Sequence, residues 1–326
     1  MEYVITDFIF LFCSILYEAL PFIILGAAIA GFLEEFVPQQ WLVRIIPKNA
    51  VLAVGISGGL GLLFPMCECG IIVVMRRLLR KGLPLSCCVA YMLAGPIINV
   101  IVILSTYVAF APYEPAQMGG FFMVGFRVAF GYVVACLTAL IVEWQYRKYG
   151  NNLLSPSVTA GLDDADHEPD VGVPKPPFWQ RLGNVSETAL HDFVDITVFL
   201  ILGALLASFT RQTMIYNPGV QEFIQGKPVL SHGLMMVLAV LLNLCSEADA
   251  FVAANLGGTA IPPTAKLAFL VLGPMIDIKL YFMYTRVFRQ RLIWIIFSTV
   301  AIQVFIYSLL FYFYWQYRWV TPTGTG

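Results

Sequence analysis

The segment FPMCECGII, residues 64–72, places two thiols and a carboxylate inside apolar sequence. Gly-rich apolar chain precedes it, and Ile-Ile-Val-Val completes the following stretch. An ionisable side chain inside a membrane span costs at least about 2.5–3.5 kcal/mol, and such residues mark functional positions. The segment therefore predicts a polar site within an otherwise apolar region.

The composition indicates that this apolar region is embedded in a membrane. The chain has 326 residues, of which 59% are hydrophobic and 12% charged, whereas soluble domains are about half apolar and a quarter charged. The net charge of −1 offers nothing to nucleic acid. We expect an all-α, multi-pass membrane protein whose surroundings are the lipid bilayer. Long apolar segments lie near residues 5–33, 50–65, 84–110, 121–143, 188–209, 232–246, 262–285 and 291–315.

Two of the apolar segments, 50–65 and 232–246, are short for a full crossing of about 20 residues. The first runs into a polar tip at residues 67–69, and the second into a polar tip at residues 245–249. Weakly polar helical sequence follows each tip. This pattern predicts a broken, re-entrant helical hairpin in each half of the chain.

The two halves resemble each other in sequence. FIILGA at 22–27 is similar to FLILGA at 199–204, a spacing of 177 residues. Further along the chain, the spacing between matching positions is 178 residues. This pattern indicates an internal duplication. It divides the chain into a first transmembrane repeat (1–149), an acidic, Pro- and Gly-rich linker (150–178) and a second transmembrane repeat (179–326). The spacing of 178 pairs Cys67 with Cys245, Pro84 with Pro262, Gly95-Pro96 with Gly273-Pro274, and Asn99 with Asp277.

Loop charge predicts that the second repeat is inverted relative to the first. If each repeat has three full spans plus the re-entrant hairpin, 13 Lys and Arg residues fall on one face and 3 on the other. If both short segments cross completely, the split is about 9 to 7. Cytoplasmic loops carry the excess of basic residues, which favours the inverted arrangement. The linker then lies in the cytoplasm and both termini lie outside.

Four stretches carry a resemblance to a known family: LPFIILGA, PMCECG, RKGLPLSCCVAYMLAGPIIN and KLAFLVLGPMIDIK. They resemble the predicted bacterial permeases that include the organoarsenical efflux permeases (ArsP-type permeases). The resemblance implies a multi-pass permease of the bacterial inner membrane. It also implies that the Cys tips and the Gly-Pro helices form the working region, and that some members export trivalent methylated or aromatic arsenicals.

The thiols suit that chemistry, because trivalent arsenic is a soft centre and soft ligands select soft centres. Two sulfurs of an organoarsenical site are expected from Cys67 and Cys69, or from one of them with Cys245. The alternative is that these residues are small buried hydrophobes, as free Cys often is. The remaining predicted substrate-binding residues are Glu68, Pro96, Asn99 and Pro274.

Carboxylates in the apolar segments predict proton coupling, which needs a carboxyl that can lose and regain a proton. We favour Glu247 and Asp277. The alternative is a carboxylate that caps a broken helix or pairs with Lys266 or Lys279, and Arg127 is expected to serve Glu18 or Asp195. The full set of predicted proton-coupling residues is Glu18, Asp195, Glu247, Asp249 and Asp277.

The predicted function is a secondary permease that exports a small thiophilic solute, such as a trivalent organoarsenical. The chain has no Walker signature and no dinucleotide fingerprint, so ATP-driven transport within it is excluded. No cofactor, resident metal or enzymatic activity is expected. Two alternatives are a transporter of another sulfur compound or metal ion, and a membrane-embedded thiol oxidoreductase in which Cys67 and Cys69 form a disulfide.

Overall fold

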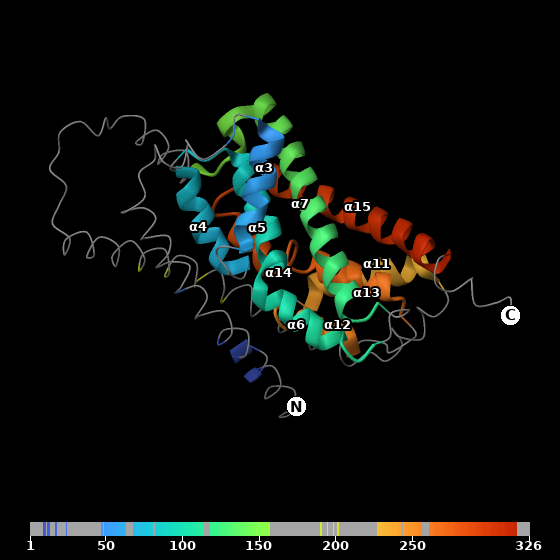
Figure 1. Ribbon diagram of the computed structural model, residues 1–326. Helices are drawn as coiled ribbons and strands as arrows, with labels where there is room; N and C mark the ends of the chain where they lie inside the picture. The colour runs from blue at the N-terminus through green and yellow to red at the C-terminus, as the bar shows by residue number, and fades with distance from the viewer. Residues whose placement is uncertain are drawn as a thin grey trace, which may run out of the picture.

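The computed structural model describes residues 47, 49–62, 68–80, 82–113, 118–156, 227–242, 244–255 and 261–317, with isolated helical positions between 9 and 24 and between 190 and 201. The described residues are almost entirely helical (Figure 1). The helices are α3 (Ala50–Gly59), η1 (Leu60–Leu62), α4 (Glu68–Arg80), α5 (Leu85–Ile98), α6 (Val100–Phe110), α7 (Gly120–Tyr149), η3 (Gly150–Leu153), α11 (Pro228–Leu242), α12 (Asp249–Asn255), α13 (Pro263–Leu272), α14 (Ile278–Tyr284) and α15 (Gln290–Trp315).

Helices α5 and α13 form the centre of the described structure. Every residue of α5 is buried, and every residue of α13 after Pro263 is buried. A helix that is apolar on all sides is stable only when it is surrounded. Accordingly, α5 contacts α3, α4, α6 and α7, while α13 contacts α11, α12, α15 and α7. The elements that carry the polar tips therefore pack directly on two apolar central helices.

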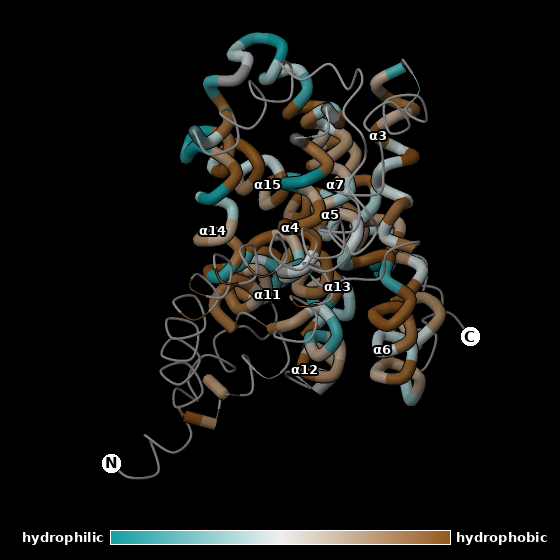
Figure 2. Tube along the Cα trace, turned by 90° about the vertical axis from the view of Figure 1, so that its left-hand side faces the viewer, coloured by the Kyte–Doolittle hydropathy of each residue, from teal (hydrophilic) through white to brown (hydrophobic). Residues whose placement is uncertain are grey.

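Helices α7 and α15 are long enough to cross a bilayer and have apolar outer faces. Together with the pair α5–α6, they are the three described helical segments with the length and hydropathy of membrane spans. Apolar side chains on their outer faces, such as Phe121 and Ile141 on α7 and Ile302 and Leu310 on α15, are exposed. Figure 2 shows hydrophobic residues along most of these helices. The protein is therefore an all-helical, multi-pass membrane protein.

Helix starts recur at the predicted spacing of 178 residues. Pro84 precedes α5 and Pro262 precedes α13, with φ/ψ of −54°/139° and −55°/139°. Asn99 caps α6 through Ile101 N–H, and Asp277 caps α14 through Leu280 N–H. Proline and short polar side chains stop one helix and start the next. Matching residues thus produce matching helix boundaries in both halves.

The Gly-Pro pairs act differently in the two halves. Pro96 lies inside α5, which continues to Ile98 and breaks at Asn99. In the second half α13 ends at Leu272, and Pro274 lies in the turn that follows. The predicted segment 262–285 is accordingly two short helices, α13 and α14, separated by residues 273–277.

The start of the predicted linker packs against the second half. Leu154 forms an antiparallel bridge with Phe288, and Leu153 accepts a hydrogen bond from Arg289 N–H at 3.0 Å. Leu153 and Leu154 are both buried, since they cover the apolar loop between α14 and α15. The rest of the linker, 157–178, lies outside the described residues.

Candidate functional site

Glu68 is the first residue of α4 and connects the first half of the chain to the second. Its Oε1 accepts a hydrogen bond from Lys279 Nζ at 3.0 Å, and its Oε2 accepts one from Ser246 Oγ at 3.1 Å. A carboxylate in the first turn of a helix is also stabilised by the helix dipole. Glu68 and Ser246 are 178 residues apart, so two positions that the duplication relates are in direct contact.

Asp277 and Lys279 enter the site from the break between α13 and α14. Asp277 is the N-cap of α14 with an extended backbone at φ −147°, which places its Oδ2 3.7 Å from Lys279 Nζ. On a regular helix, residues two apart do not face each other. The break therefore creates a contact that a continuous helix would prevent. Lys279 lies between two carboxylates, those of Glu68 and Asp277.

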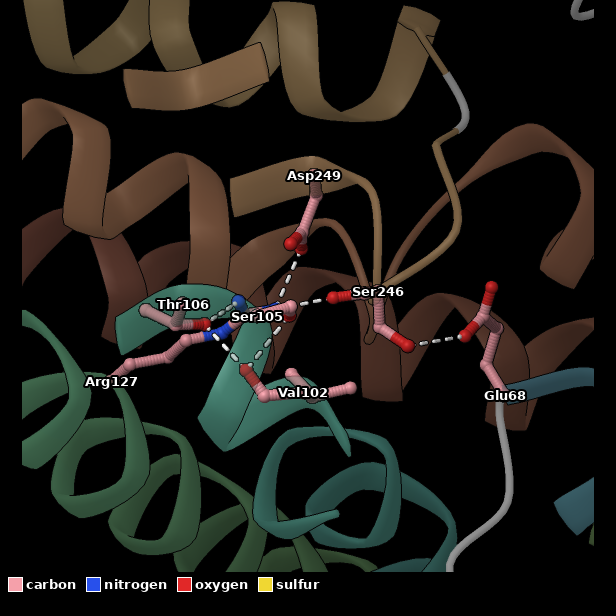
Figure 3. Close-up of polar contacts among 7 residues, drawn as sticks. All are labelled: Glu68, Val102, Ser105, Thr106, Arg127, Ser246 and Asp249. Atoms are coloured by element: carbon pink, nitrogen blue, oxygen red, sulfur yellow. Dashed lines mark hydrogen bonds and ion pairs between the residues drawn. The ribbon is translucent and has the colours of Figure 1, made fainter. Parts of the chain in front are cut away.

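Arg127 on α7 ties the second tip, residues 245–249, to the first half (Figure 3). Its guanidinium donates to Asp249 Oδ2 at 2.7 Å and to the Ser246 carbonyl at 3.2 Å. It also donates to Thr106 Oγ1 at 2.6 Å, and Thr106 in turn donates to the Val102 carbonyl at 2.7 Å. A planar guanidinium can satisfy several acceptors at once. Arg127 thus supplies donors where the interrupted helix leaves acceptors exposed.

These contacts form one buried polar network that spans the two halves. Its five charged residues are each 1–2% exposed. Two of its ion pairs, Glu68–Lys279 and Arg127–Asp249, cross between the halves, whereas Asp277–Lys279 lies within the second half. Helix contacts follow the same exchange, with α4 against α14 and α6 against α12. The network consists of Glu68, Arg127, Ser246, Asp249, Asp277 and Lys279, with Thr106 as a supporting residue.

The predicted thiol site is described only in part. Cys67 lies outside the described residues, and so does the side chain of Cys69. Cys245 is half-buried, and its carbonyl accepts hydrogen bonds from the Ala248 and Asp249 N–H groups at 3.0 Å. Cys245 therefore begins the turn that leads into α12, directly before Ser246 of the network.

The other predicted substrate-binding residues lie around the central helices. Glu68 is in the network, as described above. Asn99 is fully buried and caps α6, and its Nδ2 has no hydrogen-bond partner among the described residues. Gly95, next to Pro96, is where α4 and η1 approach α5 most closely, since a Cβ there would lie 2.5 Å from Ile71 Cδ1. Pro274 is buried in the turn before Asp277.

The predicted proton-coupling residues divide into two groups. Asp249 and Asp277 belong to the network, and Glu247 is half-buried in the turn between Ser246 and α12. Glu18 and Asp195 lie outside the described residues. The sequence suggested those two acids as partners of Arg127, whereas the structure pairs Arg127 with Asp249. Because Glu18 and Asp195 are not described, their pairing with Arg127 stays a prediction; the Asp249 pair was not foreseen, since spacing along the chain does not show which helices cross near one another.

Sequence reasoning did not find every member of the network. Lys279 was expected as a partner of Asp277, but its shorter contact is with Glu68, 211 residues away. Ser246 and Thr106 carried no signal, because hydroxyl side chains are common in apolar helices. The expected alternative partner Lys266 donates instead to the Ala254 carbonyl at 2.9 Å and lies 5.5 Å from the Tyr113 ring centroid.

Comparisons with known proteins agree with the permease resemblance. The sequence matches the family described as "Predicted permease" (ArsP_1) over residues 5–313. It is 37% identical to the UPF0718 protein YcgR of Bacillus subtilis (strain 168) over 92% of this chain and 95% of that protein. It is 30% identical to a protein of Streptococcus mutans serotype c, over 92% of this chain and 93% of that protein, which is named as a candidate subunit of a two-component membrane permease complex.

No solved structure matches the chain. The family match covers both tips, all the described helices apart from the last residues of α15, and the whole polar network. With the all-helical fold and its membrane-length helices, it leads to one conclusion. The chain belongs to the ArsP_1 family of predicted permeases and is a multi-pass membrane permease.

Proposed function

We propose that this permease is a secondary transporter of the bacterial inner membrane that exports a small thiophilic solute, such as a trivalent organoarsenical. The observation that carries the proposal is the buried network at the point where broken segments of the two halves meet. Ionisable residues within membrane segments mark substrate and ion pathways. Transporters built from two repeats bind substrate at the interface between the repeats, near discontinuous helices.

A two-fold relation between the duplicated halves is supported by the pattern of contacts. A two-fold axis that exchanges the repeats would map α4 onto α12 and α14 onto α6. The contact of α4 with α14 and the contact of α6 with α12 are then equivalent. A direct bond between Glu68 and Ser246, which the spacing relates, is what residues beside such an axis would form. In this proposal the axis passes between the two tips.

The substrate site is proposed to use the sulfurs of Cys67, Cys69 and Cys245. Support comes from the Ser246–Glu68 hydrogen bond. Cys245 directly precedes Ser246 in the sequence, and Cys67 and Cys69 flank Glu68. Soft sulfur ligands select soft centres, and an organoarsenical offers two such sites. Asn99, Pro96 and Pro274 are proposed to shape the surrounding helix breaks rather than to coordinate the solute.

Export is proposed to be driven by protons, with the carboxylates of the network as carriers. Burial favours the protonated form of a carboxyl, because it disfavours the charged form. Such a carboxyl can release its proton when the site opens to water. Asp249, Asp277 and Glu247 lie at or beside the tips, where substrate would also bind. Binding of substrate and proton at one buried site would make the two compete, which is the requirement for exchange.

The test is solute flux in everted membrane vesicles that contain the wild-type chain or single Cys→Ser variants. Methylarsenite, phenylarsenite and a sulfur compound without arsenic are supplied in parallel. Wild-type vesicles should accumulate an arsenical when a proton gradient is present and stop when a protonophore removes it. C67S and C245S should lose most of this accumulation.

Cys136→Ser is the matched control, because Cys136 lies on α7, half-buried, at a position the proposed site does not use. Equal flux in C67S and wild type would rule out thiol binding as the basis of transport. If no solute moves, and Cys67 and Cys69 instead form a disulfide reversibly in a redox buffer, the oxidoreductase alternative is correct.

A further inference from the structure

We propose that Asp277 holds one exchangeable proton on Oδ2, and that losing this proton draws Lys279 away from Glu68 and loosens the contact between the halves. This inference deepens the proton-coupling part of the proposed function and rests on it for its role in transport. The placement of the proton itself depends only on the geometry of the network.

The acids and bases around Asp277 are unequal in number. Glu68 and Asp277 are both buried acids, and both lie against a single ammonium group, that of Lys279, at 3.0 and 3.7 Å. The charged groups that act on Asp277 are Lys279 and Glu68. Two carboxylates beside one cation leave one uncompensated negative charge. Because a buried unpaired charge is far more costly than a neutral acid, one of the two carboxyls holds a proton.

The hydrogen bonds of Glu68 and Asp277 indicate which of the two acids holds the proton. Both oxygens of Glu68 accept hydrogen bonds, one from Lys279 and one from Ser246, so Glu68 is well placed as the anion. Asp277 Oδ1 accepts the Leu280 N–H, whereas Oδ2 has no hydrogen bond within the described part of the chain. Hydrogen bonds to the charged form favour that form. The proton therefore belongs on Asp277 Oδ2.

Arg127, Asp249 and Lys266 are not among the charges that act on Asp277. Arg127 and Asp249 form a one-to-one pair at 2.7 Å and compensate each other. Lys266 binds the Ala254 carbonyl, at the opposite end of α12 from Asp249. The shared Lys279 is thus the feature that distinguishes Asp277 from Asp249.

A neutral side chain is compatible with the structural role of Asp277. Asn99, its counterpart 178 residues earlier, caps α6 with an uncharged amide oxygen. A protonated Asp277 still caps α14 through Oδ1, because the proton lies on the other oxygen. The cap survives both states of the carboxyl, so proton exchange need not unfold the start of α14.

The consequence for the contact between halves follows from the shared lysine. When the site opens to water, the O–H bond of Oδ2 breaks and the proton passes to water, leaving a carboxylate. That carboxylate competes with Glu68 for Lys279, and the Glu68–Lys279 pair is a direct link between α4 and α14. Deprotonation therefore weakens the link, and reprotonation restores it.

The test is infrared spectroscopy of the purified full chain in lipid nanodiscs at neutral pH, which requires no substrate. Protonated carboxyls have a C=O stretching band that carboxylates lack. Wild-type protein should show a band that shifts when aspartate is labelled with ¹³C in its side-chain carboxyl. D277N should lose this component, and so should E68Q, because Asp277 then has Lys279 to itself and ionises.

Two further variants complete the experiment. D249N is the matched control. Asp249 is paired with Arg127 and is expected to be ionised, so it contributes nothing to the band of protonated carboxyls, and D249N should keep the ¹³C-sensitive component. K279M removes the shared base, so both Glu68 and Asp277 should be protonated and the signal assigned to this pair should rise about twofold. Thermal unfolding of each variant establishes that it is folded; the isotope shift of the wild type shows a protonated aspartate, and its loss in D277N assigns the proton to Asp277.

A wild-type band without a ¹³C-aspartate shift would overturn the inference, as would persistence of the component in D277N or its loss in D249N. These outcomes are separate from those of the flux assay. Flux without this band would move the proton carrier to another acid such as Glu247, whereas the band without flux would leave Asp277 protonated in a protein with a different function.

Discussion

Arg127 shows how a single residue makes a broken helix tolerable inside a membrane. It binds the carbonyl of Ser246, which lies where the chain is not helical, and the carboxylate of Asp249, the first residue of α12. Non-helical backbone at membrane depth persists only where protein satisfies its polar groups. Arg127 is therefore primarily a stabilising residue, whereas the Glu68–Lys279–Asp277 group has the unequal charge that function can use.

Removing Arg127 should destabilise the protein strongly. R127M leaves Asp249 buried without its base and should cost about 3–5 kcal/mol, because breaking one partner of a buried pair strands the other charge. The double variant R127M/D249N should recover most of the loss. The measurement is the free energy of unfolding in a denaturing detergent titration.

The control for that prediction is R147M, which removes the exposed i,i+4 pair between Arg147 and Glu143. Surface pairs contribute at most about 1 kcal/mol, so this variant should unfold close to wild type. Strictly additive losses in the double variant would show that Arg127 and Asp249 do not act as a pair.

The two caps at equivalent positions lead to a second prediction at this scale. D277A and N99A should each lose about 0.5–2 kcal/mol, because Ala cannot accept the first free N–H groups of α14 and α6. D277N should unfold near the wild-type midpoint, since Asn99 already performs the same task. A loss in D277N as large as that in D277A would show that charge, rather than the cap, holds α14.

Among the elements, η1 and α5 approach each other at two glycines. A Cβ on Gly61 would lie 2.6 Å from Gly95 Cα, which is backbone and cannot move aside. Small residues let membrane helices approach closely, where packing rather than the hydrophobic effect drives association. This contact, together with Ile71 of α4 against Gly95, holds the chain on both sides of the first tip against the central helix.

A methyl group added at Gly61 should push η1 away from α5. G61A should lower the free energy of unfolding by about 1–3 kcal/mol, as overpacking does in tight cores. G59A is the matched control, because no atom lies within 4 Å of a Cβ at Gly59. Thermal melting in nanodiscs compares the two, and equal midpoints would mean that η1 can move off α5 without cost.

At the scale of the whole molecule, two buried ion pairs among the described residues, Glu68–Lys279 and Arg127–Asp249, join the halves. Each half contributes one acid and one base to these pairs, so neither half satisfies its buried charges alone. The outer faces of α7 and α15 carry exposed apolar side chains, while the charges of the network are buried. We infer that the halves depend on each other for stability.

The proposed inverted arrangement can be checked by the sides on which the chain is exposed. A fluorescent protein inserted after residue 165 should fluoresce, because the linker is predicted in the cytoplasm. Alkaline phosphatase fused after Gly326 should be active, because the C-terminus is predicted outside. If both reporters indicate the same side, each half crosses an even number of times and the repeats are parallel.

The sequence was sufficient to predict the membrane class, the family and the pairing of equivalent positions in the two halves. Composition and apolar runs follow from the hydrophobic effect, which acts on each segment by itself. Proline and short polar residues stop and start helices through local backbone chemistry, and the pairs Pro84/Pro262 and Asn99/Asp277 do precede equivalent helices. The runs 84–110 and 262–285 were each predicted as one segment, and the structure divides them at Asn99 and Asp277.

Only the tertiary structure decided which charges meet. Glu68 pairs with Lys279 across 211 residues and Arg127 with Asp249 across 122, distances at which spacing carries no information. Helix crossings bring these residues together, and the cost of burying an unpaired charge selects the partner once they are close. The sharing of one lysine by two acids, on which the proposed proton site depends, is a property of that packing alone.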